Sequence, residues 1–270
     1  MNPRVFGIIG GGWRAEYYLR VAQELPEHFC VGGMFVRNEG KGRVLEERWG
    51  ARTCRSLDAL LRVPGLQFVV ISVPANVAPD MIRRLAEHGM PALSETPPAA
   101  DLNGLLGLQD LIETEARVQV AEQYQFQPLH AARLQIARSG RLGTITQAQV
   151  SAAHGYHGLS LLRGFLGVTF ERATIRARDF VSPIIAGPDR GGSPTEEKVT
   201  QSRQVIADLD FGDRLGVFDF TGDQYFSWIR RQRVLVRGER GEITNREVRY
   251  LKDFSTPVEL ELRRVDAGQD

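Results

Sequence analysis

A glycine-rich turn near the N-terminus has the residue types and spacing that bind a dinucleotide. In the stretch GIIGGGWRA, Gly10, Gly12 and Ala15 fit the pattern G-x-G-x-x-G/A. The first glycine permits a tight turn, the second lets the backbone approach a pyrophosphate, and the small third residue lets the next helix pack on the strand. A strand pattern precedes the turn and a helix pattern follows it. We therefore expect this turn to bind NAD or NADP; the alternative is a glycine turn that binds nothing.

The end of the second predicted strand, MFVRN, bears on which dinucleotide binds. NAD selectivity usually needs an acid there to hold the ribose 2′-hydroxyl, but this chain has Val36 and Arg37. A guanidinium can hold a 2′-phosphate through two hydrogen bonds, whereas a carboxylate would repel it. The sequence favours NADP over NAD; alternatively, Arg37 stacks on the adenine or is solvated. Arg14, in the first turn of the helix, is a second candidate phosphate contact or a solvated arginine.

Groups that can transfer a proton occur together in the stretch AAHGYHG, which contains His154, Tyr156 and His157. A histidine titrates near neutral pH and can both accept and donate a proton, which hydride transfer at a secondary alcohol requires. Tyr124, at the junction of two predicted domains, is a further candidate. A lone histidine is more often a structural residue, so the residues alone leave both interpretations open.

The first 122 residues alternate short apolar runs with helical patterns, which is typical of a doubly wound parallel sheet. The continuous apolar run LQFVVISVP indicates a strand covered on both faces. The stretch DLNGLLGLQDLIETEA predicts a single helix that begins at Asp101. We assign residues 1–122 to a dinucleotide-binding Rossmann domain.

Residues 123–270 follow a different pattern and predict an α+β domain for substrate binding and oligomerisation. Long strand-like runs, such as TQSRQVIADLDF and RLGVFDFTG, are joined by turns typical of hairpins. Only a few helical patterns interrupt them, so we expect an open, mostly antiparallel sheet. Residues 182–198 are rich in proline and glycine and predict a long surface loop.

The bulk properties of the 270-residue chain exclude several classes of protein. Apolar residues make up 42% and charged residues 25%, and the net charge of +1 gives no global field for nucleic acid or an anionic membrane. No apolar run approaches the length of a membrane span, and the N-terminus lacks a secretory pattern. Cys30 and Cys54 form neither a metal-type pair nor a disulfide framework. We expect a cytoplasmic protein with a small-molecule substrate and no metal.

Six stretches, in order, make the chain resemble the glucose–fructose oxidoreductase/inositol dehydrogenase family (GFO/IDH/MocA). They are FGIIGGGWRAEYYL, VVISVPANVAPDMIRRLAEHG, ALSETPPA, AEQYQFQP, RSGRLGTI and YHGLSLLRGFLG. The resemblance covers most of residues 4–245. It implies a Rossmann domain followed by an α/β domain with an open antiparallel sheet. It also implies hydride transfer, with NAD or NADP, at a carbonyl or alcohol of a sugar, a cyclitol or a related compound.

The chain departs from the catalytic pattern of this family. Glu95-Thr96-Pro97 stands where the family has Glu-Lys-Pro, and Ala153 and Ser160 replace the two acids that flank the matched histidine, His157. The family lysine moves the proton and polarises the carbonyl, so another group must act here. Members also extend further at the C-terminus, and we expect this chain to be a short variant or a truncated one.

The resemblance and the residues together give the expected site. The candidate catalytic residues are His157 first, then Thr96, Tyr124 and His154. Thr96 would bond the substrate or the nicotinamide carboxamide, or merely fill the turn, and Glu95 would orient the nicotinamide ribose. The expected cofactor contacts are Gly10, Gly12, Trp13, Arg14, Arg37, Pro74, Asn76, Glu95, Thr96 and Gln123.

Two functions compete at this point. The first is an NAD(P)-dependent oxidoreductase with a rearranged proton relay. The second is a non-catalytic dinucleotide-binding sensor or assembly protein, because the family's lysine and aspartate are missing. For either we expect a homodimer or homotetramer that associates through an uncovered apolar face of the C-terminal sheet. The residues expected on that face are Ile206, Leu209, Phe211, Val217 and Phe218.

Overall fold

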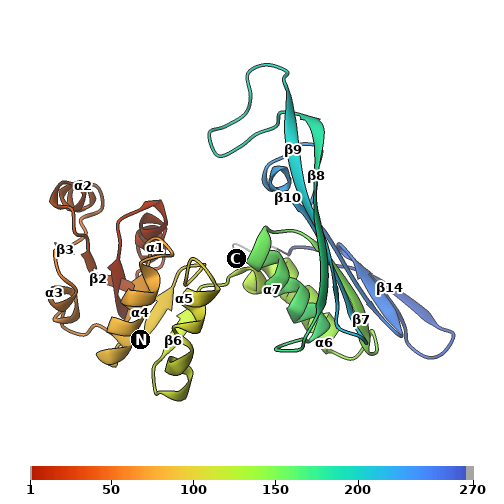
Figure 1. Cartoon of the computed structure of the whole chain (residues 1–270), viewed down its shortest axis with the longest axis horizontal. Coiled ribbons are helices and arrows are strands. Elements are labelled where there is room, and N and C mark those ends of the chain that lie inside the picture. The colour runs from red at the N-terminus through yellow and green to blue at the C-terminus, as the bar shows by residue number, and fades with distance from the viewer. Residues whose placement is uncertain (1, 266–270) are drawn as a thin grey trace. The chain divides into compact units, whose positions relative to one another are not determined.

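The computed structural model describes residues 2–265. The chain divides into two compact units, Met1–Glu122 and Gln123–Asp270, which we call the N-terminal and the C-terminal unit (Figure 1). Among the described residues, no helix has both the length and the apolar character needed to cross a membrane.

The N-terminal unit contains a six-stranded parallel sheet, which confirms the predicted doubly wound fold. Its strand order is β3-β2-β1-β4-β5-β6, so the order reverses between β1 and β4. Open α/β sheets bind their ligands at the carboxyl ends of the strands, at such a reversal. The strands are β1 Arg4–Ile9, β2 Phe29–Phe35, β3 Thr53–Cys54, β4 Phe68–Ile71, β5 Ala92–Ser94 and β6 Val118–Val120.

Helices cover both faces of this sheet, because apolar side chains project from both faces into separate clusters of buried residues. The helices are α1 Trp13–Glu24, α2 Glu39–Trp49, α3 Leu57–Leu61, α4 Ala78–Glu87, α5 Leu102–Leu106 and the 3₁₀ helix η1 Gln109–Glu113. The prediction of one helix from Asp101 was wrong, since α5 ends at Gly107 and η1 follows. Neither segment has a fully buried residue, and only the partly buried Leu111 of η1 packs against the core, so little packing offsets the cost of two glycines in a helix.

The C-terminal unit contains an eight-stranded sheet in the order β14-β13-β12-β11-β7-β10-β9-β8. All neighbouring strands are antiparallel except β7 and β10, which confirms the predicted class. The strands are β7 Ile145–Ser151, β8 Thr174–Ile185, β9 Val199–Asp210, β10 Leu215–Thr221, β11 Arg233–Gly238, β12 Gly241–Thr244, β13 Glu247–Leu251 and β14 Pro257–Glu261. The helices are η2 Tyr124–Phe126, α6 Pro128–Arg138, α7 Gly155–Leu166 and η3 Gly222–Tyr225.

The predicted loop at 182–198 is shorter than expected. β8 runs to Ile185 and stays paired with β9 over the whole of its length. Pro183 is compatible with this pairing because β8 is an edge strand, where a missing N–H leaves no neighbour unsatisfied.

The two helices α6 and α7 lie on the same face of this sheet (Figure 1), and the apolar core of the unit forms there. Leu209 and Phe218 are buried in this core, and Phe211 packs against it. Five residues were expected on an uncovered apolar face. The strand register shows that two of them, Ile206 and Val217, project from the sheet face opposite to α6 and α7. The prediction grouped residues that the alternation of a strand places on two faces.

The opposite face, which we call the open face, carries ion pairs between strands. Arg176 pairs with Asp208 at 3.8 Å, Arg233 with Asp219 at 2.6 Å, Arg237 with Glu242 at 3.0 Å and Arg249 with Glu259 at 2.9 Å. Ion pairs of this kind therefore lie on the open face together with apolar side chains such as Ile206 and Val217.

One buried histidine should make the C-terminal unit sensitive to acid. The His130 ring is 4% exposed and accepts a hydrogen bond through Nδ1 from Arg133 at 3.2 Å. Burial, and then the charge of Arg133, lowers the pKa of His130 to about 4. The unfolded chain, with a histidine pKa near 6.5, therefore binds more protons than the folded one between these two values, and stability falls as the pH falls through this range.

We expect the C-terminal unit to lose roughly 2 kcal/mol of unfolding free energy between pH 7 and pH 5. Urea unfolding followed by the fluorescence of Trp228 measures it. His130→Gln should flatten this dependence, while His28→Gln, at an exposed position of the other unit, should leave it unchanged. An equally steep dependence in His130→Gln would contradict the assignment.

Candidate functional site

The glycine turn has the backbone that a dinucleotide site needs. Gly10 follows β1 with φ +114°, a conformation that side-chain-bearing residues rarely adopt. A Cβ at Gly10 would lie 2.1 Å from the carbonyl oxygen of Ser72, which follows β4. The glycine turn thus packs closely against the end of β4, at the point where the strand order reverses.

Gly12 leaves the N-terminus of α1 open for an anion. It is the N-cap residue, and no side chain caps the helix. A Cβ at Gly12 would meet no atom within 4 Å. The bare N–H groups and the positive end of the helix dipole fit a pyrophosphate. Trp13 is 66% exposed beside this turn, and Pro74 and Asn76, also exposed, follow β4.

Three basic side chains lie toward the carboxyl end of β2. Arg37 is exposed, and within residues 2–265 it has no ion-pair partner. Nη1 of Arg55 donates to the carbonyl oxygen of Val36 at 3.3 Å. The Cε of Lys41 lies 3.4 Å from the point that a Cβ on Gly11 would occupy. Neither Lys41 nor Arg55, which follows β3, was predicted as a contact from the sequence.

Arg14 was a candidate contact for the cofactor phosphate, but in the structure it pairs with the carboxylate of Glu95. Its Nε lies 2.9 Å from Oε1 of Glu95, and the hydroxyl of Tyr18 donates to the same oxygen at 2.5 Å. Burial, followed by this hydrogen bond, raises the pKa of Tyr18 far above its usual value. Two residues one turn apart on α1 therefore hold the glutamate that follows β5. The i, i+4 spacing of Arg14 and Tyr18 was the available signal for this contact.

Thr96 is the residue for which the resemblance to the family predicts a lysine. It is half-buried, and in the part of the chain that is described its side chain has no hydrogen bond. The Thr96–Pro97 peptide bond is cis. The residue before this cis-proline thus carries a hydroxyl and no ammonium group.

The candidate acid–base residues of the C-terminal unit form one cluster of rings. The His157 ring centroid lies 4.7 Å from that of Tyr124, 4.9 Å from that of His154 and 4.4 Å from that of Tyr156. Nδ1 of His154 lies 2.6 Å from the hydroxyl of Tyr225. His157 is 5% exposed, whereas His154 and Tyr156 are exposed. The structure brings the four predicted residues together and adds Tyr225, which no motif in the sequence indicated.

Two further positions of the C-terminal unit bear on the expected site. Ala153, where the resemblance to the family predicts an aspartate, is fully buried. The amide oxygen of Gln123 is buried, and it has no hydrogen-bond partner among residues 2–265. An unsatisfied buried acceptor is costly, and a ligand that donates a hydrogen bond would satisfy it.

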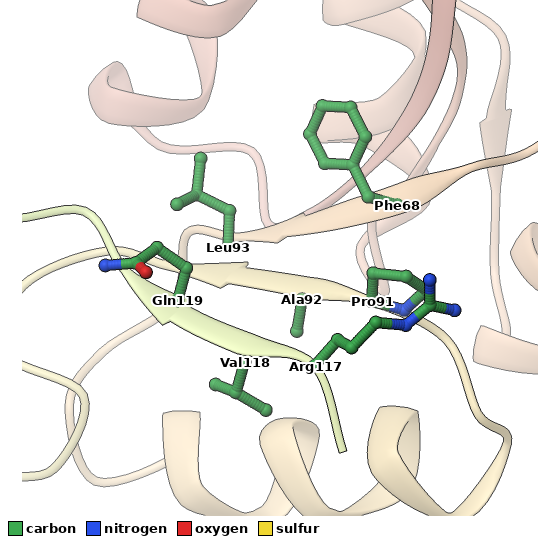
Figure 2. Close-up of a pocket in the computed structure, with 7 residues that line it drawn as sticks. All are labelled: Phe68, Pro91, Ala92, Leu93, Arg117, Val118 and Gln119. Atoms are coloured by element: carbon green, nitrogen blue, oxygen red, sulfur yellow. The ribbon is translucent and has the colours of Figure 1, made fainter. Parts of the chain in front are cut away.

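A shallow hollow of about 430 Å³ lies at the amino-terminal ends of the strands of the N-terminal sheet. Figure 2 shows that Phe68, Ala92 and Val118, the first residues of β4, β5 and β6, line it. Arg117, at the mouth, precedes β6. This amino-terminal edge is opposite to the one that holds the glycine turn, so the hollow is not the dinucleotide site. The described residues contain no cluster of three or more His, Cys, Asp or Glu side chains that could hold a metal.

Residues 4–124 match the family model described as an oxidoreductase family with an NAD-binding Rossmann fold, GFO/IDH/MocA. The uncharacterized protein YMR315W of Saccharomyces cerevisiae is 27% identical over 152 residues, which are 54% of this chain and 44% of the yeast protein. The matched stretch therefore spans less than half of that relative.

Two solved structures share the fold over nearly the whole chain. Levoglucosan dehydrogenase, in complex with NADH, aligns with a TM-score of 0.72 and 16% identity over 98% of this chain and 80% of that one. An oxidoreductase of Agrobacterium radiobacter, in complex with NAD⁺, L-tartaric acid and magnesium, aligns with a TM-score of 0.69 and 16% identity over 96% and 80%. The matched family model covers the Rossmann unit, where the glycine turn lies. The Rossmann unit of this chain is therefore similar to the oxidoreductase family with an NAD-binding Rossmann fold, GFO/IDH/MocA, and the solved structures share the fold of both units.

Proposed function

We propose that this protein is an NAD(P)-dependent oxidoreductase that transfers a hydride to or from a carbonyl or alcohol carbon of a sugar, a cyclitol or a related small molecule. The observation that carries the proposal is the uncapped N-terminus of α1 behind Gly12, at the reversal of the strand order. When bound, the nicotinamide supplies or accepts the hydride. The substrate class is supported by the family and by structural neighbours such as levoglucosan dehydrogenase.

The protein's own residues must then transfer the proton that the substrate oxygen gains or loses. We propose that His157, which stands at the family's histidine position, takes the role of the absent lysine, with Tyr124 and His154 beside it in the ring cluster. A histidine suits this task because it exchanges protons near neutral pH. Thr96 would contribute a hydrogen bond to the substrate or the carboxamide, and Gln123 would receive one from a ligand.

A non-catalytic dinucleotide-binding protein is the second candidate. The buried Ala153 in the place of an acid, and Thr96 in the place of a lysine, favour it. Oxidation of NADPH by a panel of ketoses, inososes and imines separates the two candidates. Binding of NADPH without turnover on any member of the panel would support the sensor, and measurable turnover would exclude it.

We propose that the cofactor is NADP in preference to NAD. Arg37 and Lys41 lie toward the carboxyl end of β2, and the nearby Glu39 is paired with Arg43 at 2.5 Å. This arrangement presents positive charge where NAD-selective proteins place an acid.

Arg37→Asp should therefore reverse the preference, so that NADH binds more tightly than NADPH. The new carboxylate would repel the 2′-phosphate and could hold the 2′-hydroxyl, and each tenfold change corresponds to about 1.4 kcal/mol. Titration by nucleotide fluorescence measures both affinities. Arg43→Asp, on helix α2 that follows Arg37, is the control. Equal affinities of the two nucleotides in the parent, and no change in the mutant, would show that Arg37 does not contact the phosphate.

A further inference from the structure

We infer that Tyr225 fixes the neutral ring of His154 in the tautomer that carries its proton on Nε2, so that His154 acts as a hydrogen-bond donor to a carbonyl substrate. This inference rests on the proposed function for the identity of the ligand, but the tautomer itself is a property of the protein alone. It assigns Tyr225 a positioning role and favours the direction of carbonyl reduction.

The Tyr225 hydroxyl makes several polar contacts within the C-terminal unit. The backbone N–H of His154 donates to this oxygen at 3.1 Å, and the hydroxyl of Tyr124 donates to it at 3.4 Å. A phenolic oxygen has two acceptor positions and one proton. Both acceptor positions are therefore engaged by these two donors.

The remaining contact of the hydroxyl decides the tautomer. Nδ1 of His154 lies 2.6 Å from the Tyr225 oxygen. The hydroxyl proton has this nitrogen as its acceptor, so Nδ1 receives a hydrogen bond and cannot carry a proton itself in the neutral ring. The ring proton is then on Nε2. The His154 side chain is exposed, at the N-cap of α7, where a ligand can reach it.

A second set of contacts keeps Tyr225 in place. η3 begins with a capping box between Thr221 and Gln224. Nε2 of Gln224 donates to the carbonyl oxygen of Ser151 at 3.2 Å and to that of Arg231 at 2.8 Å. Ser151 ends β7, three residues before His154, so this bridge ties together the two segments that carry the tyrosine and the histidine. Gln224 and Ser151 are both buried, which protects these hydrogen bonds from exchange with water.

The aromatic neighbours also restrict the tyrosine. The rings of Tyr225 and Phe220 meet edge to face, with centroids 5.1 Å apart. An aromatic contact of this geometry holds the ring plane, and the hydroxyl is therefore aimed at His154 before any ligand binds.

The chemical consequence concerns the substrate. A neutral imidazole that presents N–H can donate a hydrogen bond to a carbonyl oxygen and stabilise the negative charge that develops there as hydride arrives at carbon. It cannot accept a proton from an alcohol at the same nitrogen. The preferred substrate is therefore a carbonyl compound, which agrees with a preference for NADP.

Nitrogen NMR of protein labelled at the histidine rings tests the tautomer without a ligand. The chain has five histidines, and loss of signals in His154→Gln assigns those of His154. At a pH where the ring is neutral, the parent should show a protonated Nε2 and an unprotonated Nδ1. Tyr225→Phe should give a mixture of tautomers, and Tyr250→Phe, a tyrosine of β13, should leave the parent pattern. A proton on Nδ1 in the parent, or an unchanged pattern in Tyr225→Phe, overturns the inference.

Kinetics with defined probes then separate this inference from the proposed function. With NADPH and the ketose that the panel identifies as the best substrate, Tyr225→Phe should lower kcat roughly 10-fold or more without changing the affinity for NADPH. An unchanged kcat in Tyr225→Phe overturns the positioning role. Failure of the parent to bind NADPH would refute the proposed function, whereas the NMR result would still decide the tautomer.

Discussion

Replacement of His157 by alanine should lower kcat by roughly 10²- to 10⁴-fold while the affinity for NADPH stays nearly unchanged. His157 belongs to the C-terminal unit and is packed among Tyr124, His154 and Tyr156, whereas the glycine turn belongs to the N-terminal unit. Loss of a proton-transfer group slows the chemical step and leaves the groups that hold the pyrophosphate intact. Single-turnover oxidation of NADPH and nucleotide titration measure the two quantities separately.

His157 is only 5% exposed, so its replacement by alanine also removes packing. A second variant must therefore separate the loss of proton transfer from the loss of packing. His157→Asn keeps a polar group in a similar space and should lose turnover to a comparable degree with a smaller loss of thermal stability. His88→Ala, at an exposed helix end, is the matched control and should behave as the parent. If His157→Ala turns over as fast as the parent, the proton passes through another group of the cluster.

Substitutions at Gly10 and Gly12, two residues apart in the glycine turn, should have opposite effects on stability and on nucleotide binding. Gly12→Ser should weaken NADPH binding by roughly 10²-fold, about 3 kcal/mol, and leave the stability unchanged or slightly higher. Gly12 has an ordinary φ of −82° and open space around its Cβ position, so the apoprotein accepts a side chain there. Serine is a good N-cap, but its hydroxyl would occupy the N–H groups that the pyrophosphate needs.

Gly10→Ala should instead destabilise the N-terminal unit by roughly 3 kcal/mol or more. The φ of +114° disfavours any side chain, and the backbone oxygen of Ser72 cannot yield as a flexible side chain would. Urea unfolding and nucleotide titration of both variants check the pair. Tight NADPH binding by Gly12→Ser would refute the assignment of the dinucleotide to this helix end.

Local patterns explain why the Rossmann unit could be predicted. The strand, the glycine turn and the helix follow each other within about twenty residues, and each imposes its own periodicity. The prediction of one long helix after Asp101 was wrong because pattern alone does not report whether an apolar stripe finds a partner. In the structure α5 and η1 have no buried residue.

The site was predictable only where its residues are close in sequence. His154 and His157 share one turn of chain, and Tyr124 lies in a quoted family stretch. Tyr225 lies 71 residues from His154 and reaches it through the pairing of β7 with β10, which no local pattern encodes. Arg55 similarly meets the end of β2 from 19 residues away, across the β2–β3 contact.

The open face of the C-terminal sheet has a consequence for how a second copy could dock. Its ion pairs, such as Arg233 with Asp219 and Arg249 with Glu259, bridge strands and are half or more exposed at the arginine. A partner on this face would have to match alternating charges, so the register of the contact would be selective. Mobile ions screen such charges over about 8 Å at physiological ionic strength. Association here would weaken as salt is added, whereas the apolar interface expected from the sequence would tighten.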